Sequence, residues 1–479
     1  MVDHRPVAHL RPETGWMNDP IGPIRWRGRT HLFHQANPAG GFWDRPHWGH
    51  FATADLVHWE RRPLALSPDA DGPDADGCYS GCVVDDDGVA TMLYTGARGP
   101  LGHSQAQTTC VARSTDDDLD TWTKDPENPV AEPPPDLDLL GYRDPFVWSD
   151  GGRWHQLIGA GIVGQGGAVL HLTSDDLRSW TDEGPLLTGA TLDAADVDGA
   201  AWTGTMWECP ALLRGPDADA LIVNVHDDTT ASPKPTHHPV AVIGRLADGA
   251  FTPRRLQRVD AGPDLYAPCL LVEPSGAVMW GWSWEALPVE AQRAAGWSGV
   301  LSLPRAVQVV DGQLVVTPLP ELDDLRTDAR RITRVARDGG WRAEGAVGDV
   351  VALVLRVAVD RGPVELAVRC APDRAEVTTI GFDPQAGRLW LDRDRSSLDP
   401  AATGGTHTAA ATVPDEVVEL RCVVDRSIVE VFVAGVALTA RIYPTRPDSV
   451  GVEVTGPGAD AVDLAAYDLG SVWVSSTSG

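Results

Sequence analysis

The sequence contains almost no lysine: only Lys124 and Lys234 occur among its 479 residues. Its 68 acidic and 39 basic residues give a formal net charge of −29. Such a chain repels phosphate backbones and anionic lipids, so nucleic acids and membrane surfaces are poor partners. The acidic residues are spread along the chain without a long acidic tail, which is typical of a solvated surface.

Long hydrophobic runs are also missing. No stretch of about 18 apolar residues occurs, so the sequence predicts no membrane-spanning helix. Residues 1–16 lack the apolar core of a secretory signal. We therefore expect a cytoplasmic protein, or a secreted one if a leader has been removed.

The seven cysteines include no Cys-x-x-Cys pair. Cys78 and Cys82 are the nearest two, and no second pair is present to complete a zinc site with them. An odd number of scattered cysteines fits reduced thiols in a reducing compartment. The sequence thus implies neither a metal nor another cofactor.

Helical periodicity is nearly absent too, and short alternating segments bounded by Gly, Asp and Pro predict strands instead. Three segments, 52–66, 114–130 and 173–187, each contain a small or hydroxyl residue, then acidic residues, a Leu and a Trp. Their tryptophans are 63 and 58 residues apart. A repeat of about 60 residues that holds several short strands is typical of a four-stranded propeller blade.

The chain up to about residue 310 has room for five such blades. Beyond it, alternating strands with frequent turns are typical of an antiparallel β-sandwich. We therefore predict an all-β protein with a five-bladed β-propeller followed by a C-terminal β-sandwich. The predicted boundaries are 1–310 for the propeller, 311–334 for a linker and 335–479 for the sandwich.

Three carboxylates stand directly before a proline, or one residue before it, in similar local sequences: Asp19 in WMNDP, Asp144 in YRDP and Glu208 in WECP. Their separations of 125 and 64 residues equal about two blades and one blade. That spacing predicts equivalent positions in three blades, with the carboxylates converging on the central channel. Converging carboxylates cost electrostatic energy, which proteins tolerate at functional sites.

Two opposed carboxylates can hydrolyse a glycosidic bond, one attacking the anomeric carbon and the other protonating the leaving oxygen. The nucleophile must be ionised, whereas the acid needs a raised pKa. We expect Arg143 to hold Asp144 ionised, which would suit Asp144 for binding sugar hydroxyls. The 18 tryptophans offer flat faces for sugar rings, although most tryptophans are ordinarily core residues.

The ordered segments WMNDP, YRDP and WECP resemble the signature segments of glycoside hydrolase family 32, the family of invertases, inulinases and levanases. HLFHQANP, CYSGCVV, MLYTG, DLYAP and MWGW also match, and VEVFVAGVALTARIYP is similar to the family's sandwich domain. The resemblance covers nearly the whole chain. It implies retaining cleavage of terminal β-D-fructofuranosyl linkages, in sucrose or fructans, through a covalent fructosyl-enzyme.

The resemblance also implies roles for single residues. Asp19 corresponds to the nucleophile, Glu208 to the acid/base, and Asp144 with Arg143 to the group that binds fructose hydroxyls and stabilises the transition state. The other positions that match the fructose subsite are Asn18, Gln35, Trp43, Tyr79, Ser80, Tyr266 and Trp282.

Two positions depart from the family pattern, since Ile21 stands where the family has Asn and Ala211 where it has Asp. Both lie within two or three residues of a predicted catalytic carboxylate. If Ile21 faces the leaving-group sugar, the enzyme should be a poor sucrase; otherwise Ile21 simply packs behind the loop.

Alternatives remain open at this stage. A fructosyltransferase on the same scaffold, such as a levan fructotransferase that forms a difructose anhydride, shares the chemistry up to the fructosyl-enzyme. A non-catalytic fructan-binding module would not need all three carboxylates, and furanosidases acting on arabinose lack the WMNDP context. The expected partner is a small or oligosaccharide fructoside, and a homodimer contact through the sandwich is also open.

Overall fold

The computed structural model describes residues 2–102, 104–195, 203–227, 237–345, 348–413 and 415–474. Strands make up most of the regular structure in these ranges, which confirms the all-β prediction. The helical segments are α1 (Gly189–Ala194), α2 (Val289–Ala295) and three short 3₁₀ turns, η1 (Pro320–Leu325), η2 (Val359–Arg361) and η3 (Ala459–Ala461). No helix among the described residues has the length and apolar character needed to cross a bilayer.

Five sheets, antiparallel except for the pairing of β1 with β19, follow one another along the described residues between 15 and 318. The first contains β1 (Gly15–Trp26), β2 (Arg29–Asn37), β3 (His47–Thr53), β4 (Trp59–Leu66) and the late strand β19 (Trp297–Ser298). The second contains β5 (Gly77–Asp86), β6 (Val89–Arg98), β7 (Ala106–Ser114) and β8 (Trp122–Lys124). The third contains β9 (Leu139–Asp150), β10 (Arg153–Ile162), β11 (Gly166–Ser174) and β12 (Trp180–Thr188).

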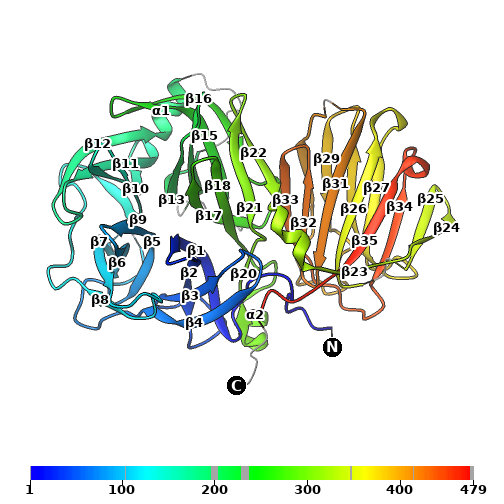
Figure 1. The fold of residues 1–479 in the computed structure, drawn as a ribbon, viewed down its shortest axis with the longest axis horizontal. Helices are drawn as coiled ribbons and strands as arrows, with labels where there is room; N and C mark the ends of the chain where they lie inside the picture. Colours follow the sequence, from blue (N-terminus) through cyan, green and yellow to red (C-terminus); the bar gives the residue numbers. More distant parts are fainter. Residues whose placement is uncertain are drawn as a thin grey trace.

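The fourth sheet contains β13 (Met206–Leu213), β14 (Asp219–His226), β15 (His238–Ala247) and β16 (Ala250–Arg258). The fifth contains β17 (Leu265–Glu273), β18 (Gly276–Ser283), β20 (Val300–Leu301), β21 (Arg305–Val310) and β22 (Gln313–Pro318). The first strand of each sheet contacts the first strands of both neighbouring sheets, so β1, β5, β9, β13 and β17 form a closed ring. Figure 1 shows these five strands around the middle of the left-hand group of sheets. We call residues 15–318 the ring.

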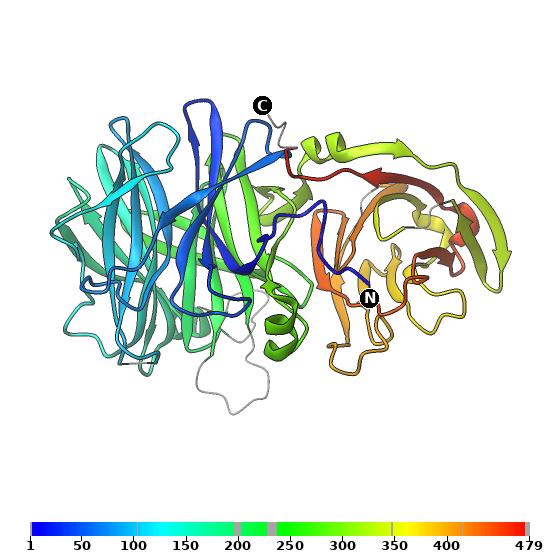
Figure 2. The same ribbon diagram turned by 90° about the horizontal axis from the view of Figure 1, so that it is seen from below.

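Two further sheets form what we call the two-sheet part, residues 326–469. One runs in the order β23 (Arg326–Ala329), β35 (Asp463–Leu469), β26 (Val350–Ala358), β31 (Val417–Asp425), β32 (Ile428–Val433) and β33 (Val436–Arg441). The other runs β24 (Thr333–Arg337), β25 (Gly340–Glu344), β34 (Gly451–Thr455), β27 (Val364–Cys370), β28 (Thr378–Asp383), β29 (Arg388–Asp392) and β30 (Thr406–Ala410). Figure 2 shows the ring and the two-sheet part side by side.

The fifth sheet extends past the boundary predicted at residue 310. Strands β21 and β22 form a hairpin that pairs with β18, so the segment up to Pro318 belongs to the ring. The predicted linker 311–334 accordingly contains β22, η1, β23 and the first residues of β24. The change in strand pattern near residue 310 therefore lies at the turn of the β21–β22 hairpin rather than at the end of a sheet.

The sequence repeat has a local cause. Leu56, Leu119 and Leu177 all have positive φ and each lies in the turn between the third and fourth strands of its sheet. Hydroxyl groups at the end of the preceding strand accept backbone N–H bonds in all three turns, from Leu56 and Leu177 at 3.0 Å and from Asp116 at 3.3 Å. The tryptophan of each repeat then begins the outer strand. The repeat is thus a side-chain-stabilised turn that is used three times.

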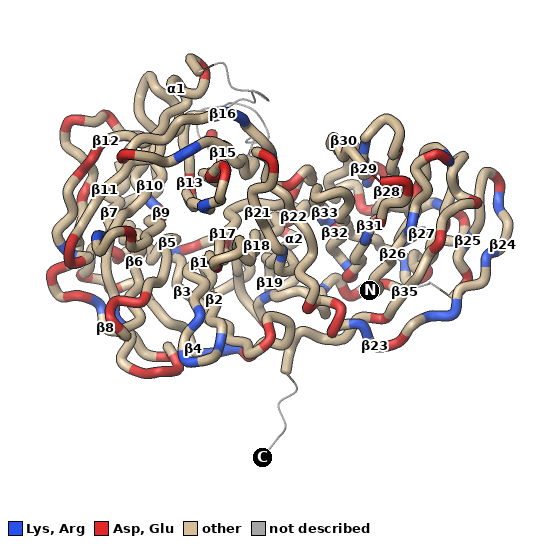
Figure 3. The backbone as a smooth tube through the Cα atoms, turned by 45° about the horizontal axis from the view of Figure 1, so that its top comes forward, with Lys and Arg blue, Asp and Glu red and all other residues tan. Residues whose placement is uncertain are grey.

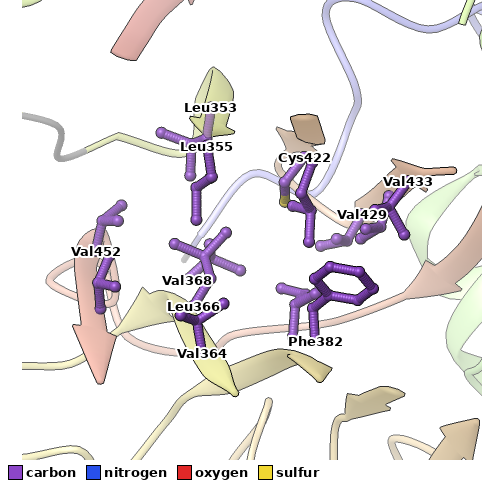
Figure 4. Close-up of a cluster of buried hydrophobic side chains, with 14 of the residues drawn as sticks. Leu353, Leu355, Val364, Leu366, Val368, Phe382, Cys422, Val429, Val433 and Val452 are labelled. Atoms are coloured by element: carbon purple, nitrogen blue, oxygen red, sulfur yellow. The ribbon is translucent and has the colours of Figure 1, made fainter. Parts of the chain in front are cut away.

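Apolar side chains fill the space between the layers of the two-sheet part, and their burial is the main stabilising contribution there. Figure 4 shows this core, in which one sheet contributes Leu353, Leu355, Cys422, Val429 and Val433 and the other contributes Val364, Leu366, Val368, Phe382 and Val452. Acidic and basic positions are distributed over both the ring and the two-sheet part (Figure 3).

The segment before β1 connects the ring to the two-sheet part through a buried histidine. Imidazole nitrogens of His9 lie 2.8 Å from Asp425 Oδ2 and 3.4 Å from Glu430 Oε1, and all three side chains are fully buried. Burial alone would lower the pKa of His9, but its bonds to the two carboxylates outweigh that effect and raise it to about 9. His9 is therefore protonated in the folded protein at neutral pH.

We expect the folded protein to lose stability in mild alkali, because His9 is deprotonated there and its ion pair is lost. Because the folded pKa of His9 is raised, its stabilisation is complete below about pH 6.5 and is lost as the pH rises through about 9, a change of about 3 kcal/mol. Thermal unfolding between pH 7 and 9.5 should show a smaller decrease in Tm for His9→Gln than for the wild type.

The control is His58→Gln, which removes an exposed His58–Asp55 pair of equal length, 2.8 Å. An exposed pair contributes little to stability, so this variant should follow the wild-type curve. Equal slopes for all three proteins would contradict the role given to His9.

Candidate active site

A cavity of about 580 Å³ opens at the centre of the ring. Asp19, Asp144 and Glu208 all line it, so the structure brings the three predicted carboxylates together. Of the other predicted residues, Ser80 does not line the cavity but contacts Asp19 from behind. Those that line it are Asn18, Gln35, Trp43, Tyr79, Arg143, Tyr266 and Trp282.

A bulge in the inner strands directs these side chains into the cavity. The strand register shifts after Met17, Tyr79, Arg143, Glu208 and Tyr266. A bulge allows two consecutive residues to reach the same side of a strand, whereas regular pleating would direct them to opposite faces.

The bulges correct one prediction, the equivalence of the three carboxylates. Asp144, Cys209 and Ala267 share the bulge position before Pro and all have positive φ, at 65°, 43° and 45°. The counterpart of Asp144 in β13 is therefore Cys209, and Glu208 lies one residue earlier, where β9 has Arg143. The spacing of the three carboxylates located the right strands. It could not distinguish Glu208 from Cys209 as the counterpart of Asp144, because the sequence repeat itself varies in length by several residues.

Asp19 is held by neutral donors. Ser80 Oγ donates to Asp19 Oδ2 at 2.7 Å, and Asn18 Nδ2 donates to Oδ1 at 3.1 Å. Gln35 orients both donors, because its Nε2 donates to Ser80 Oγ at 2.7 Å and its Oε1 accepts from Asn18 at 2.9 Å. Burial and the nearby carboxylates Asp144 and Glu208 outweigh these bonds and raise the pKa of Asp19 to about 7.

Glu208 has charged and polar partners on both oxygens. Arg143 Nε and Nη2 donate to Oε1 at 2.9 and 2.6 Å, and the Tyr266 hydroxyl donates to Oε2 at 2.5 Å. Burial raises the pKa of Glu208, but Arg143, His226 and Tyr266 outweigh it and lower the pKa to about 2.

Asp144 is held differently from the prediction. Its nearest approach to Arg143 is 4.0 Å, and it accepts instead from the backbone N–H of Cys209 at 3.0 Å. Burial is the main reason that the pKa of Asp144 rises to about 6, with Arg143 opposing it. Arg143 therefore pairs mainly with Glu208, because the two residues hold the same position before the bulge on the neighbouring strands β9 and β13.

Aromatic side chains form one wall of the cavity. Trp282 stacks on Trp284 with ring centroids 4.3 Å apart, and Trp16 contacts Trp282 edge-on at 5.6 Å. Trp43 is 37% exposed, which leaves an open aromatic face at the mouth. Such walls bind the apolar faces of sugar rings.

Sequence reasoning missed several lining residues: Trp16, Leu101, Gln105, Gln107, Leu140, His226 and Trp284. Trp284 follows Trp282 by two residues, so strand alternation could have placed both on one face. Gln105 accepts a bond from the Tyr79 hydroxyl at 3.0 Å, but nothing in its local sequence distinguishes it from a surface residue.

We call the cavity that Asp19 and Glu208 line the sugar-sized cavity. Ile21 and Ala211 lie outside it. Both side chains are 2% exposed and line a second cavity, of about 560 Å³, beyond the bulges on the same inner strands. Ile21 packs in an apolar cluster with Phe33, Trp48 and Val83. This placement favours the interpretation that Ile21 packs behind the loop.

No group of three or more His, Cys, Asp or Glu residues within the described ranges could hold a metal ion. The arrangement is instead two carboxylates with different partners, facing one cavity of sugar size with aromatic walls. These are the features of a glycoside hydrolase site.

Comparison with known proteins agrees with this arrangement. Models of the N-terminal and C-terminal domains of glycosyl hydrolases family 32 match residues 9–318 and 321–468. The chain is 32% identical to raffinose invertase of Escherichia coli, covering 95% of this chain and 93% of that protein. It is 34% identical to sucrose-6-phosphate hydrolase of Klebsiella pneumoniae, covering 93% and 90%.

Among solved structures, a GH32 beta-fructofuranosidase of Bombyx mori superposes with a TM-score of 0.81 at 26% identity, covering 99% of this chain and 96% of that one. The chain therefore belongs to glycosyl hydrolase family 32. It is a glycoside hydrolase, as the motif resemblance predicted.

The buried position of Ile21 leads to a test by substitution. Ile21→Asn places an amide in an apolar cluster, so it should destabilise the protein by about 1–3 kcal/mol. Because the side chain does not reach the sugar-sized cavity, the ratios of kcat/KM among sucrose, inulin and levan should stay unchanged. Ile21→Val is the matched control, and a shift of the ratios in Ile21→Asn alone would show that position 21 acts on specificity.

Proposed function

We propose that this protein is a retaining, exo-acting β-fructofuranosidase that releases fructose from sucrose or fructans. The observation that carries the proposal is the placement of Asp19 and Glu208 on opposite inner strands, β1 and β13, with both side chains facing one cavity. The names of the relatives support it, since they include a raffinose invertase, sucrose-6-phosphate hydrolases and a levanase. One Bombyx mori beta-fructofuranosidase is described in complex with sucrose.

We also propose that the five sheets of the ring are the blades of a five-bladed β-propeller and that the two-sheet part is its β-sandwich. The closed cycle of contacts among the five inner strands supports the first assignment. The shared apolar core between the two sheets supports the second.

In the proposed reaction, the Asp19 carboxylate attacks the anomeric carbon of fructose while the glycosidic C–O bond breaks. Glu208 gives its proton to the departing oxygen, and the fructosyl group is then bonded to Asp19. In the second half, Glu208 takes a proton from water, and the oxygen of that water displaces Asp19 and releases fructose.

The pKa values place a constraint on this reaction. They favour a proton on Asp19 or Asp144 over one on Glu208, the reverse of what the first step needs. Sugar hydroxyls that donate to Asp19 and Asp144 favour the ionised forms of both. Bound fructose should therefore lower the pKa of Asp19 and Asp144, which favours the ionised nucleophile that the first step needs.

Asp144 then binds rather than reacts. Its backbone N–H donates to Thr95 Oγ1 at 2.7 Å and its side chain accepts from the Cys209 N–H at 3.0 Å, so the carboxylate is fixed in the cavity wall. A fixed anion beside the sugar also stabilises the positive charge that develops at the anomeric carbon in the transition state.

Product analysis tests the proposed function. Chromatography of sucrose, inulin and levan digests should show free fructose as the released unit, and proton NMR should show the first anomer formed to be the β form. Accumulation of a difructose anhydride or longer fructosyl chains would support the transferase instead. Binding without any product would support the fructan-binding module.

The roles of Asp19 and Glu208 can be separated with an aryl β-fructofuranoside, whose leaving group needs no proton. Asp19→Asn should lose several orders of magnitude in kcat on every substrate. Glu208→Gln should lose as much on sucrose but retain much of its first step, measured as the burst of phenolate, on the aryl fructoside. Equal recovery in both variants would show that the two roles are assigned wrongly.

A further inference from the structure

The two-sheet part reaches the site through the segment that leads into β17. Asp264 is buried there, and its Oδ2 accepts the backbone N–H of Arg441 at 2.7 Å. Both terminal nitrogens of Arg393 also donate to the Asp264 carboxylate. Two residues further on, Tyr266 donates to Glu208. Side chains and backbone of the two-sheet part thus fix the start of the strand that holds a partner of Glu208.

The Arg441 side chain makes a second connection, to Glu285. Arg441 Nη1 donates to Glu285 Oε1 at 2.9 Å, and the Tyr443 hydroxyl donates to Oε2. Glu285 directly follows Trp284, whose backbone N–H donates to the carbonyl of Asp264 at 2.7 Å. The aromatic wall of the cavity and the strand of Tyr266 are therefore held by one group of buried residues.

Glu285 also connects to the strand of Asp19. Its Oε1 accepts the backbone N–H of Gly299 at 2.9 Å. Gly299 lies so close to β1 that a Cβ there would stand 1.7 Å from the carbonyl oxygen of Met17, two residues before Asp19. The same carboxylate thus contacts elements that lead to both proposed reacting groups.

We propose that Arg441 is a positioning residue for this reaction, whose guanidinium acts through Glu285. Glu285 fixes the neighbouring Trp284, and the Trp284 N–H bonds to the Asp264 carbonyl, so this contact keeps the aromatic wall in place and the Tyr266 hydroxyl on Glu208. The inference rests on the proposed function, since it concerns how well Glu208 delivers its proton. Arg441 is fully buried. Its Nε donates to the Ser427 carbonyl at 3.0 Å, its Nη2 to the Ser427 hydroxyl at 3.1 Å and its Nη1 also to the Ser283 carbonyl at 3.4 Å. Its guanidinium therefore has one geometry, which a lysine cannot reproduce.

The same interface contains a second buried arginine that serves as a control. Arg305 donates to Asp260 at 2.6 Å and to Glu430 at 3.0 Å, and all three side chains are fully buried. None of these three residues, nor Thr439 that bonds to two of them, lines the sugar-sized cavity. Loss of either arginine should destabilise the interface, but only Arg441 connects to the partners of Glu208.

The test compares Arg441→Lys with Arg305→Lys, at a temperature where the Tm of each shows it to be folded. For Arg441→Lys, kcat on sucrose should fall about 10- to 100-fold, because a displaced Tyr266 leaves Glu208 in the wrong orientation. The phenolate burst on the aryl β-fructofuranoside should fall less than 3-fold, since that step needs no proton. Arg305→Lys should keep both rates within about 2-fold of the wild type despite a lower Tm.

A milder pair of variants decides the question if Arg441→Lys fails to fold. Tyr443→Phe removes one hydroxyl from Glu285, and Thr439→Val removes one from the Arg305 group. Tyr443→Phe should lower kcat on sucrose several-fold with an unchanged aryl fructoside burst, and Thr439→Val should change neither. Equal losses on both substrates, or equal losses in the two members of a pair, would overturn the proposal. A wild type that releases no fructose would instead refute the proposed function.

Discussion

Electrostatic repulsion among three carboxylates in one cavity is the constraint on which the rest of the site depends. Asp19, Asp144 and Glu208 are relieved mainly by one cation, Arg143, which is committed to Glu208. The other two anions are balanced by neutral donors and, in part, by protonation. Neutral hydrogen bonds are short-ranged, so every donor must be held in place by a second group. This requirement accounts for the sequence of supports from Gln35 to Ser80 to Asp19.

The sequence patterns predict the strands and the residue types of the site, but not the bulges that set the positions of single side chains. The repeated turn with its tryptophan identified three of the five sheets, and the carboxylates near prolines identified three of the strands that line the cavity. Neither pattern encodes a bulge, so the equivalence of Glu208 with Asp144 was wrong by one residue, and with it the partner of Arg143. Residues such as Gln105 reach the cavity only through the tertiary fold. The hairpin of β21 and β22 shows the same limit at residue 310, since its pairing with β18 is not visible in local composition.

The interface between the ring and the two-sheet part combines apolar packing with several buried ion pairs. His9, Arg305 and Arg441 each pair there with carboxylates that are 6% exposed or less. Burying such groups costs desolvation that apolar contacts would not. These pairs fix the relative position of the two parts, because charged hydrogen bonds define a direction and a distance, whereas apolar contacts can slide. Glu208 and its partner Tyr266 are supported from the two-sheet part through such bonds, so their positions depend on that fixed geometry.

The first sheet contains strands from distant parts of the chain, and this affects how the enzyme is made. Beside β1 lies β19, and the start of β4 at Trp59 pairs with Trp473 through backbone bonds of 2.7 and 3.1 Å. During translation, the residues around Asp19 leave the ribosome early, yet the sheet that holds them gains its last partners only near residue 474. A nascent chain therefore exposes Asp19 long before the last neighbours of its sheet have been synthesised.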